Sequence, residues 1–222
     1  MKKPASNILI FIFIVLTIIV STTTGNNHLA FSIAKSLLMP ALMLYVLSYN
    51  TIPGKAIIIA GLFFSWLGDV LLLFESRNAL FFIGGLISFL TTHICYIIYF
   101  LKTTSAKRSL IRNQPWLAAL VAAYGVSLVM FLSPHLGDMK LPVIIYAAVI
   151  CTMVICSLHV FTKTNAPSNT LFITGAVLFA ASDSMLAINK FYRPFANAGI
   201  FIIATYCLAQ LLIVSGAIKR KV

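Results

Sequence analysis

Acidic residues are scarce in this chain. Only four of its 222 residues are aspartate or glutamate, and charged residues of both signs make up 9%, against 61% hydrophobic residues. A soluble domain cannot hide that much apolar surface. The composition therefore excludes an ordinary soluble globular protein and indicates an all-α integral membrane protein.

Several signatures of known enzymes and metal sites are also missing. The chain has no GxSxG elbow, no Walker loop, no GxGxxG fingerprint and no HExxH motif. Catalytic zinc usually has three protein ligands, and only His93 and His159 among the histidines lie in apolar runs. We therefore expect no metal and no cofactor. No CxxC spacing occurs, and we expect the four cysteines to be small core residues: Cys95, Cys151, Cys156 and Cys207.

Basic residues are common, and the formal net charge is +12. They fall mainly between apolar runs and at the ends of the chain, without an aromatic-rich polar face. This pattern is typical of loops beside a membrane. We therefore expect membrane lipids as neighbours and no nucleic-acid partner. The sequence leaves the oligomeric state open.

The apolar runs have the length of membrane-spanning helices, each of which needs about 20 residues. We predict a single transmembrane domain, 1–222, built as a bundle of eight transmembrane helices with short loops. The first run follows Lys2 and Lys3 as in a signal peptide, but it has no clear cleavage site and is predicted to be retained. The predicted spans are 7–23, 29–49, 55–74, 79–101, 115–132, 141–161, 169–188 and 195–218.

The loops differ in charge between the two sides of this predicted bundle. With both termini inside, the inner segments hold eleven lysines and arginines and the outer segments hold four. Lysine and arginine accumulate on the cytoplasmic side of membrane proteins. We therefore predict that both termini are cytoplasmic, in a multi-pass protein of a bacterial inner membrane.

Two of the four acidic residues, Asp69 and Asp183, lie inside apolar runs. In each run seven residues separate the aspartate from a preceding glycine, and the two runs are offset by 114 residues, which leaves an internal duplication open. Lys35 lies in another span, and all three charges are predicted roughly 5 to 7 Å to the outer side of their helix midpoints. Ionisable groups in a membrane interior cost several kcal/mol and usually serve function.

This group has a functional and a structural interpretation. In the functional one, two nearby carboxylates share a proton and supply an acid and a base, while Lys35 holds one of them ionised or binds a phosphate. In the structural one, the three charges form an ion pair that locks the spans together. On the fourth span, His93 and Tyr96 lie one turn apart and contact either a substrate or a neighbouring helix.

The chain resembles the YhhN family, whose characterised members are lysoplasmalogenases. The resemblance covers most of the chain, and the two aspartate motifs are its most specific parts. The matching stretches are Lys35-Ser36-Leu37, Met39-Pro40, Gly61-Leu62, Ser65, Gly68-Asp69, Gly85-Leu86, Phe89, His93, Tyr96, Gly175 to Phe179, Ser182-Asp183-Ser184, Leu186-Ala187, Phe191, Tyr206 and Ala209-Gln210.

The resemblance implies a metal-independent ether hydrolase that acts on a lysophospholipid. It would cleave the vinyl ether bond of a lysoplasmalogen to a fatty aldehyde and a glycerophospho-ethanolamine or -choline. We expect Asp69 and Asp183 to be catalytic. We expect the substrate to contact Lys35, Ser65, His93, Tyr96, Ser182, Asn189, Tyr206 and Gln210. The alternatives are a proton-coupled transporter or binding protein for lipids or small molecules, and a purely structural membrane component.

Overall fold

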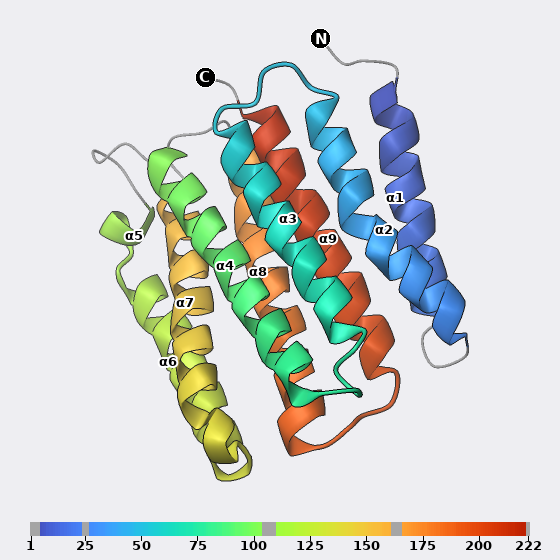
Figure 1. Ribbon diagram of the computed structural model, residues 1–222. Helices are drawn as coiled ribbons and strands as arrows, with labels where there is room; N and C mark the ends of the chain where they lie inside the picture. Colours follow the sequence, from blue (N-terminus) through green and yellow to red (C-terminus); the bar gives the residue numbers. More distant parts are fainter. Residues whose placement is uncertain (1–4, 24–26, 104–109, 161–165, 221–222) are drawn as a thin grey trace. The chain divides into compact units, whose positions relative to one another are not determined.

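The computed structural model describes residues 5–23, 27–103, 110–160 and 166–220, and every regular element in these ranges is helical (Figure 1). The chain forms two compact units, Met1–Tyr96 and Ile97–Val222. Their boundary falls inside α4, Ala79–Thr103. That they form a single transmembrane domain stays a prediction.

The first unit contains α1, Ala5–Thr23, α2, His28–Leu47, α3, Lys55–Leu72, and most of α4. Helix α1 packs on α2, and α2 packs on α3. The side chain of Asn27 begins α2 by accepting a hydrogen bond from the Ala30 backbone N–H at 3.1 Å. Gly54 precedes α3 with a φ of 70°, a conformation that favours glycine.

Glycines let α3 and α4 approach closely. A Cβ added to Gly61 would lie 2.6 Å from a ring carbon of Tyr96, and one added to Gly68 would lie 2.8 Å from the ring of Phe89. With any larger residue at either position, the aromatic ring would have to shift. Glycine at these two crossings thus allows close helix packing.

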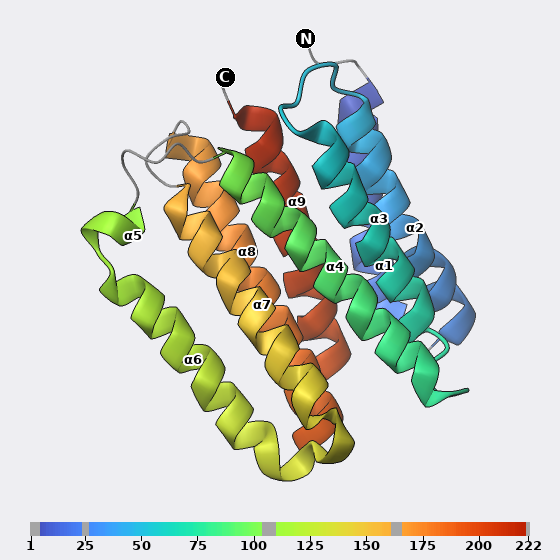
Figure 2. The same ribbon diagram turned by 60° about the vertical axis from the view of Figure 1, so that its left-hand side comes forward.

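The second unit contains the rest of the helices, and Figure 2 shows them from a second side. Helices α6 and α7 pack together, α7 packs on α8, and the most extensive contact is between α8 and α9. A π-helix, η3, continues α8, and two 3₁₀ turns join α6 to α7. The elements are α5, Leu110–Asn113, α6, Trp116–Leu132, η1, Ser133–His135, η2, Gly137–Met139, α7, Lys140–His159, α8, Ala166–Ala187, η3, Ile188–Tyr192, and α9, Ala198–Lys219.

Among the described residues, seven helices are long and apolar enough to cross a membrane: α2, α3, α4, α6, α7, α8 and α9. The protein is therefore a multi-pass integral membrane protein. The apolar stretch of α1, Asn7–Thr23, is shorter, and an eighth crossing stays a prediction, as do the cytoplasmic termini. Most predicted span ends lie within three residues of the observed helix ends, although the end predicted at 161 lies outside the described residues.

Candidate active site

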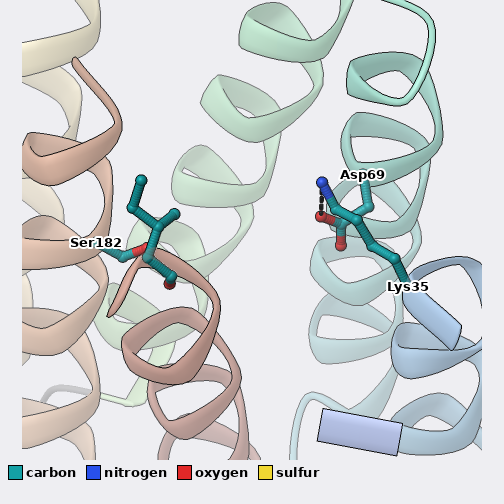
Figure 3. Close-up of polar contacts among 4 residues, drawn as sticks. Lys35, Asp69 and Ser182 are labelled. Carbon is teal, nitrogen blue, oxygen red and sulfur yellow. Dashed lines mark hydrogen bonds and ion pairs between the residues drawn. The ribbon is translucent and has the colours of Figure 1, made fainter. Parts of the chain in front are cut away.

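The first unit holds an ion pair inside the apolar part of the chain. Nζ of Lys35, on α2, lies 3.6 Å from Oδ1 of Asp69, on α3 (Figure 3), and the two side chains are 14% and 4% exposed. An ammonium group at this distance stabilises a carboxylate as its anion. Two of the three charges that were predicted to share a depth are thus in contact.

Neighbouring hydrogen bonds fix α2 and α3 beside this pair. Nε1 of Trp66, three residues before Asp69, donates to the backbone carbonyl of Ser36 at 3.0 Å. Ser36 follows Lys35 in the chain, so this bond ties together the two backbones that carry the charges. Removing either charge would leave its partner in a largely buried site, which is strongly destabilising.

Polar side chains link α3 to α4 on the same unit. The hydroxyls of Ser65 and Thr92 lie 3.0 Å apart, and Thr92 donates to the Gly61 carbonyl at 3.1 Å. His93 and Tyr96 are fully buried. The ring of Tyr96 packs against Gly61, as described above, so its observed role is helix packing. Substrate contacts by Ser65, His93 and Tyr96 stay predictions.

The second carboxylate, Asp183 on α8, has a hydroxyl partner. Oη of Tyr146, on α7, donates to Oδ2 of Asp183 at 2.5 Å. The next residue, Ser184, pairs its hydroxyl with that of Tyr124 on α6 at 2.6 Å and donates to the Ala180 carbonyl. Two successive residues of α8 are therefore held by tyrosines from two different helices.

A small cavity lies among these groups. Its volume is about 40 Å³, and its lining includes Tyr124, Tyr146, Asp183 and Ser184 together with apolar side chains of α6, α7 and α8. A buried water needs roughly 10 to 15 Å³ by this measure and two to four polar partners. The cavity meets both requirements, so it is suited to hold water beside the Asp183 carboxyl group.

The other predicted site residues of the second unit make structural contacts. Ser182 donates to the Ile202 carbonyl of α9 at 2.9 Å (Figure 3), and Oδ1 of Asn189 accepts from the Phe195 backbone N–H at 3.3 Å. The ring of Tyr206 packs edge-on against Phe179, with 5.5 Å between centroids. Gln210 on α9 is fully buried. Their contacts with a substrate also stay predictions.

Sequence reasoning did not find Tyr146, Tyr124 and Ser184 as site residues. A signal for Tyr146 was present, because it lies five residues from the outer end of its predicted span, as Asp183 does in the span that follows. At about 1.5 Å per residue, that places both residues at one depth. Tyrosine is common in apolar spans, so its presence alone does not indicate a functional site.

The described residues include no group of three or more histidines, cysteines, aspartates or glutamates that could hold a metal ion. Metal independence stays a prediction. None of the four cysteines is in a disulfide within the described residues. Asp69 and Asp183 belong to different units, and their action on one substrate stays a prediction as well.

The site thus has two carboxylates in apolar helices, one buried and one half-buried, and each contacts a group from another helix. The family model described as the YhhN family matches residues 30–217. The chain belongs to the YhhN family. The match includes both aspartates and their partners, and it excludes all of α1.

Several relatives of this family member carry enzyme names. The chain is 28% identical over 200 residues to lysoplasmalogenase TMEM86A of Bos taurus, covering 86% of this chain and 79% of the relative. It is 32% identical over 142 residues to a lysoplasmalogenase of Mycobacterium bovis, covering 61% of this chain and 50% of the relative. It is 30% identical over 159 residues to human lysoplasmalogenase TMEM86B, covering 71% and 62%. The chain thus spans half of the mycobacterial relative's length. No solved structure matches it.

Proposed function

We propose that this protein is a lysoplasmalogenase that hydrolyses the vinyl ether bond of a lysoplasmalogen by aspartate acid and base catalysis, assisted by the charge of a second aspartate. The names of its relatives supply the substrate class. The observation that carries the proposal is the unlike environment of the two carboxylates: Asp69 is paired with an ammonium group, and Asp183 has a hydroxyl donor and a water-sized cavity.

The reaction begins with a proton transfer to carbon. Asp183, as the carboxylic acid, gives its proton to the carbon of the double bond that carries the hydrocarbon chain. The electron pair of the double bond forms the new C–H bond, and an oxocarbenium ion results. Asp69, held as an anion by Lys35, stabilises that positive charge. This division of labour requires both carboxylates to act on one substrate molecule.

Water then completes the hydrolysis. A water in the cavity adds to the oxocarbenium carbon and gives a proton back to the Asp183 carboxylate. The resulting hemiacetal collapses: its C–O bond to glycerol breaks, its hydroxyl proton passes to the departing oxygen, and a fatty aldehyde is released. Asp183 ends the cycle protonated, as it began, and the pair uses the same logic as the two carboxylates of glycosidases.

The test is aldehyde release by purified protein in detergent or in liposomes. A 1-alkenyl lysophosphatidylethanolamine or lysophosphatidylcholine should yield fatty aldehyde, while the matched 1-alkyl ether, which lacks the double bond, should not. Activity should persist in EDTA. Absence of aldehyde from folded protein with both headgroups would overturn the proposal, and proton-coupled uptake in liposomes would then favour the transporter.

A further inference from the structure

A lipid-sized apolar groove runs along α6 and α7 of the second unit. Its volume is about 420 Å³, and its lining is apolar except for Thr152, whose hydroxyl donates to the Ala148 carbonyl of its own helix. Pockets of roughly 300 to 1,000 Å³ hold small-molecule ligands. The lining runs along α7 from Ile144 to Ile155, about 16 Å at 1.5 Å per residue.

The groove lies against the cavity that holds Asp183. Four residues line both hollows: Gly125, Val129, Ala147 and Cys151. The groove therefore adjoins the space beside the carboxyl group, and the shared lining consists mostly of small side chains. At the crossing of α6 and α7, a Cβ added to Gly125 would lie 2.5 Å from Sγ of Cys151, so the glycine leaves room there for the Cys151 side chain alone.

Helix α6 is also the least covered of the candidate spans. In its span 11% of the residues are buried, against 33% to 44% in the other six. Its exposed side chains include Leu120, Val126 and Met130. Uncovered apolar side chains on a membrane-spanning helix are suited to contact lipid, so we expect this groove to be reached from the bilayer.

We propose that the α6–α7 groove binds the single hydrocarbon chain of the lipid substrate and brings its first carbons to Asp183. This inference rests on the proposed function, and it names where the chain lies. The carbon that receives the proton is the one to which the hydrocarbon chain is attached, so the site of the chain decides which carboxyl group is the acid. If the hydrocarbon chain lies in this groove, the carbon that receives the proton lies next to Asp183.

The groove acts by position rather than by affinity. A chain that moves from the bilayer to the groove stays in an apolar medium, and the hydrophobic effect therefore adds little. A filled groove does fix the distance between the reacting bond and the carboxyl group, and misplacement by about 1 Å can cost 100-fold in rate. Chain length should therefore change turnover more than binding.

Two phenylalanine variants test the groove. Ala122 and Ala148 line it, and both are exposed, so Ala122→Phe and Ala148→Phe should fold normally. Each should lower kcat/KM for a hexadecenyl lysoplasmalogen by roughly 10- to 100-fold and leave that for a butenyl analogue nearly unchanged. Ala123→Phe is the matched control, because Ala123 is equally exposed on α6 but does not line the groove. Equal losses for both chain lengths, or for the control, would overturn the proposal.

A binding experiment separates this proposal from the proposed function. The probe is a 1-alkyl lysophosphatidylethanolamine with a diazirine in its chain, which no vinyl ether hydrolase cleaves. Photolabel should concentrate on α6 and α7, should be lost in Ala122→Phe, and should be displaced by unlabelled lysoplasmalogen. If the protein shows this labelling pattern but releases no aldehyde, the groove proposal stands and the proposed hydrolase activity is refuted. Label spread evenly over the exposed helices, in a protein that does release aldehyde, would refute the groove alone.

Discussion

The two carboxylates that define this protein lie in similar helix pairs and have different partners. In α3 and α4 the contacts Gly61 with Tyr96 and Ser65 with Thr92 set the register, and in α8 and α9 Gly175 lies near Ala209 and Ile213, and Phe179 contacts Tyr206. Adding the 114-residue offset to the first set of contacts reproduces the second to within about a helical turn. The shared register supports an internal repeat.

The partners break this likeness. Asp69 receives a lysine from the preceding helix, and Asp183 receives a tyrosine from the preceding long helix. An ammonium group carries a full positive charge beside its carboxylate, whereas a tyrosine hydroxyl donates a hydrogen bond and carries no charge. The two aspartates therefore have different electrostatic surroundings at equivalent positions of the two helix pairs, as the proposed division of roles requires.

The largest expected effect comes from the carboxylates themselves. Asp69→Asn and Asp183→Asn keep the side-chain shape and remove proton transfer and charge, so each should lower turnover roughly 100- to 10,000-fold. The losses should not multiply in the double variant, because groups that act as a unit are non-additive. Turnover per folded molecule is the measurement, with size-exclusion profile and Tm as folding controls. Loss of folding with an unchanged rate in the surviving protein would support a structural ion pair instead.

We expect the second-largest loss of turnover when Lys35 is replaced. Lys35→Met removes the group that holds Asp69 as an anion, so turnover should fall roughly 10- to 100-fold. The same change in an Asp69→Asn background should have little further effect on rate, since there is no anion left to hold. A full additional loss in that background would show that Lys35 acts on the substrate directly. Thermal unfolding should also report destabilisation in Lys35→Met alone.

Tyrosine 146 offers a matched pair of variants with a smaller effect. Tyr146→Phe removes the hydrogen bond to the Asp183 carboxyl group, worth about 0.5 to 1.5 kcal/mol, so kcat should fall roughly two- to tenfold. Tyr124→Phe removes a hydroxyl that lines the same cavity but bonds to Ser184, and it should keep most activity. Steady-state kinetics should show an unchanged KM in both. Equal rates for the two variants would remove Tyr146 from the positioning of Asp183.

Reporter proteins fused to the termini should have the smallest effect and leave turnover unchanged. Both termini are predicted to be cytoplasmic, which requires that α1 crosses the membrane along with the seven longer helices. A fluorescent protein at either end should be bright, and alkaline phosphatase there should be inactive. A phosphatase that is active at the N-terminus alone would remove α1 from the spans. Both carboxylate pairs would keep their environments in either case.

Sequence predicted the helices well because apolar runs and polar turns alternate clearly along this chain. It also predicted that Lys35 and the two aspartates share one depth, where opposite charges favour contact, but it left open which aspartate Lys35 would meet. The partner of Asp183 was not predicted, because tyrosine costs little in an apolar span and thus draws no attention. The hydrogen bonds of Ser182 and Asn189 to backbone groups were missed as well. Serine and asparagine bond to the backbone as readily as to a ligand, and the residue type does not separate the two.

The small size of the Asp183 cavity has a consequence for the choice of nucleophile. With about 40 Å³, it accommodates between one and three water molecules and excludes glycerol and other bulky alcohols. An oxocarbenium ion reacts with any nearby hydroxyl, and the departing glycerol of the lipid carries such groups. In the proposed reaction, a cavity of this size would favour attack by water over transfer of the hydrocarbon chain to a second lipid. Each turnover of that reaction would consume one water molecule, which the solvent must replace.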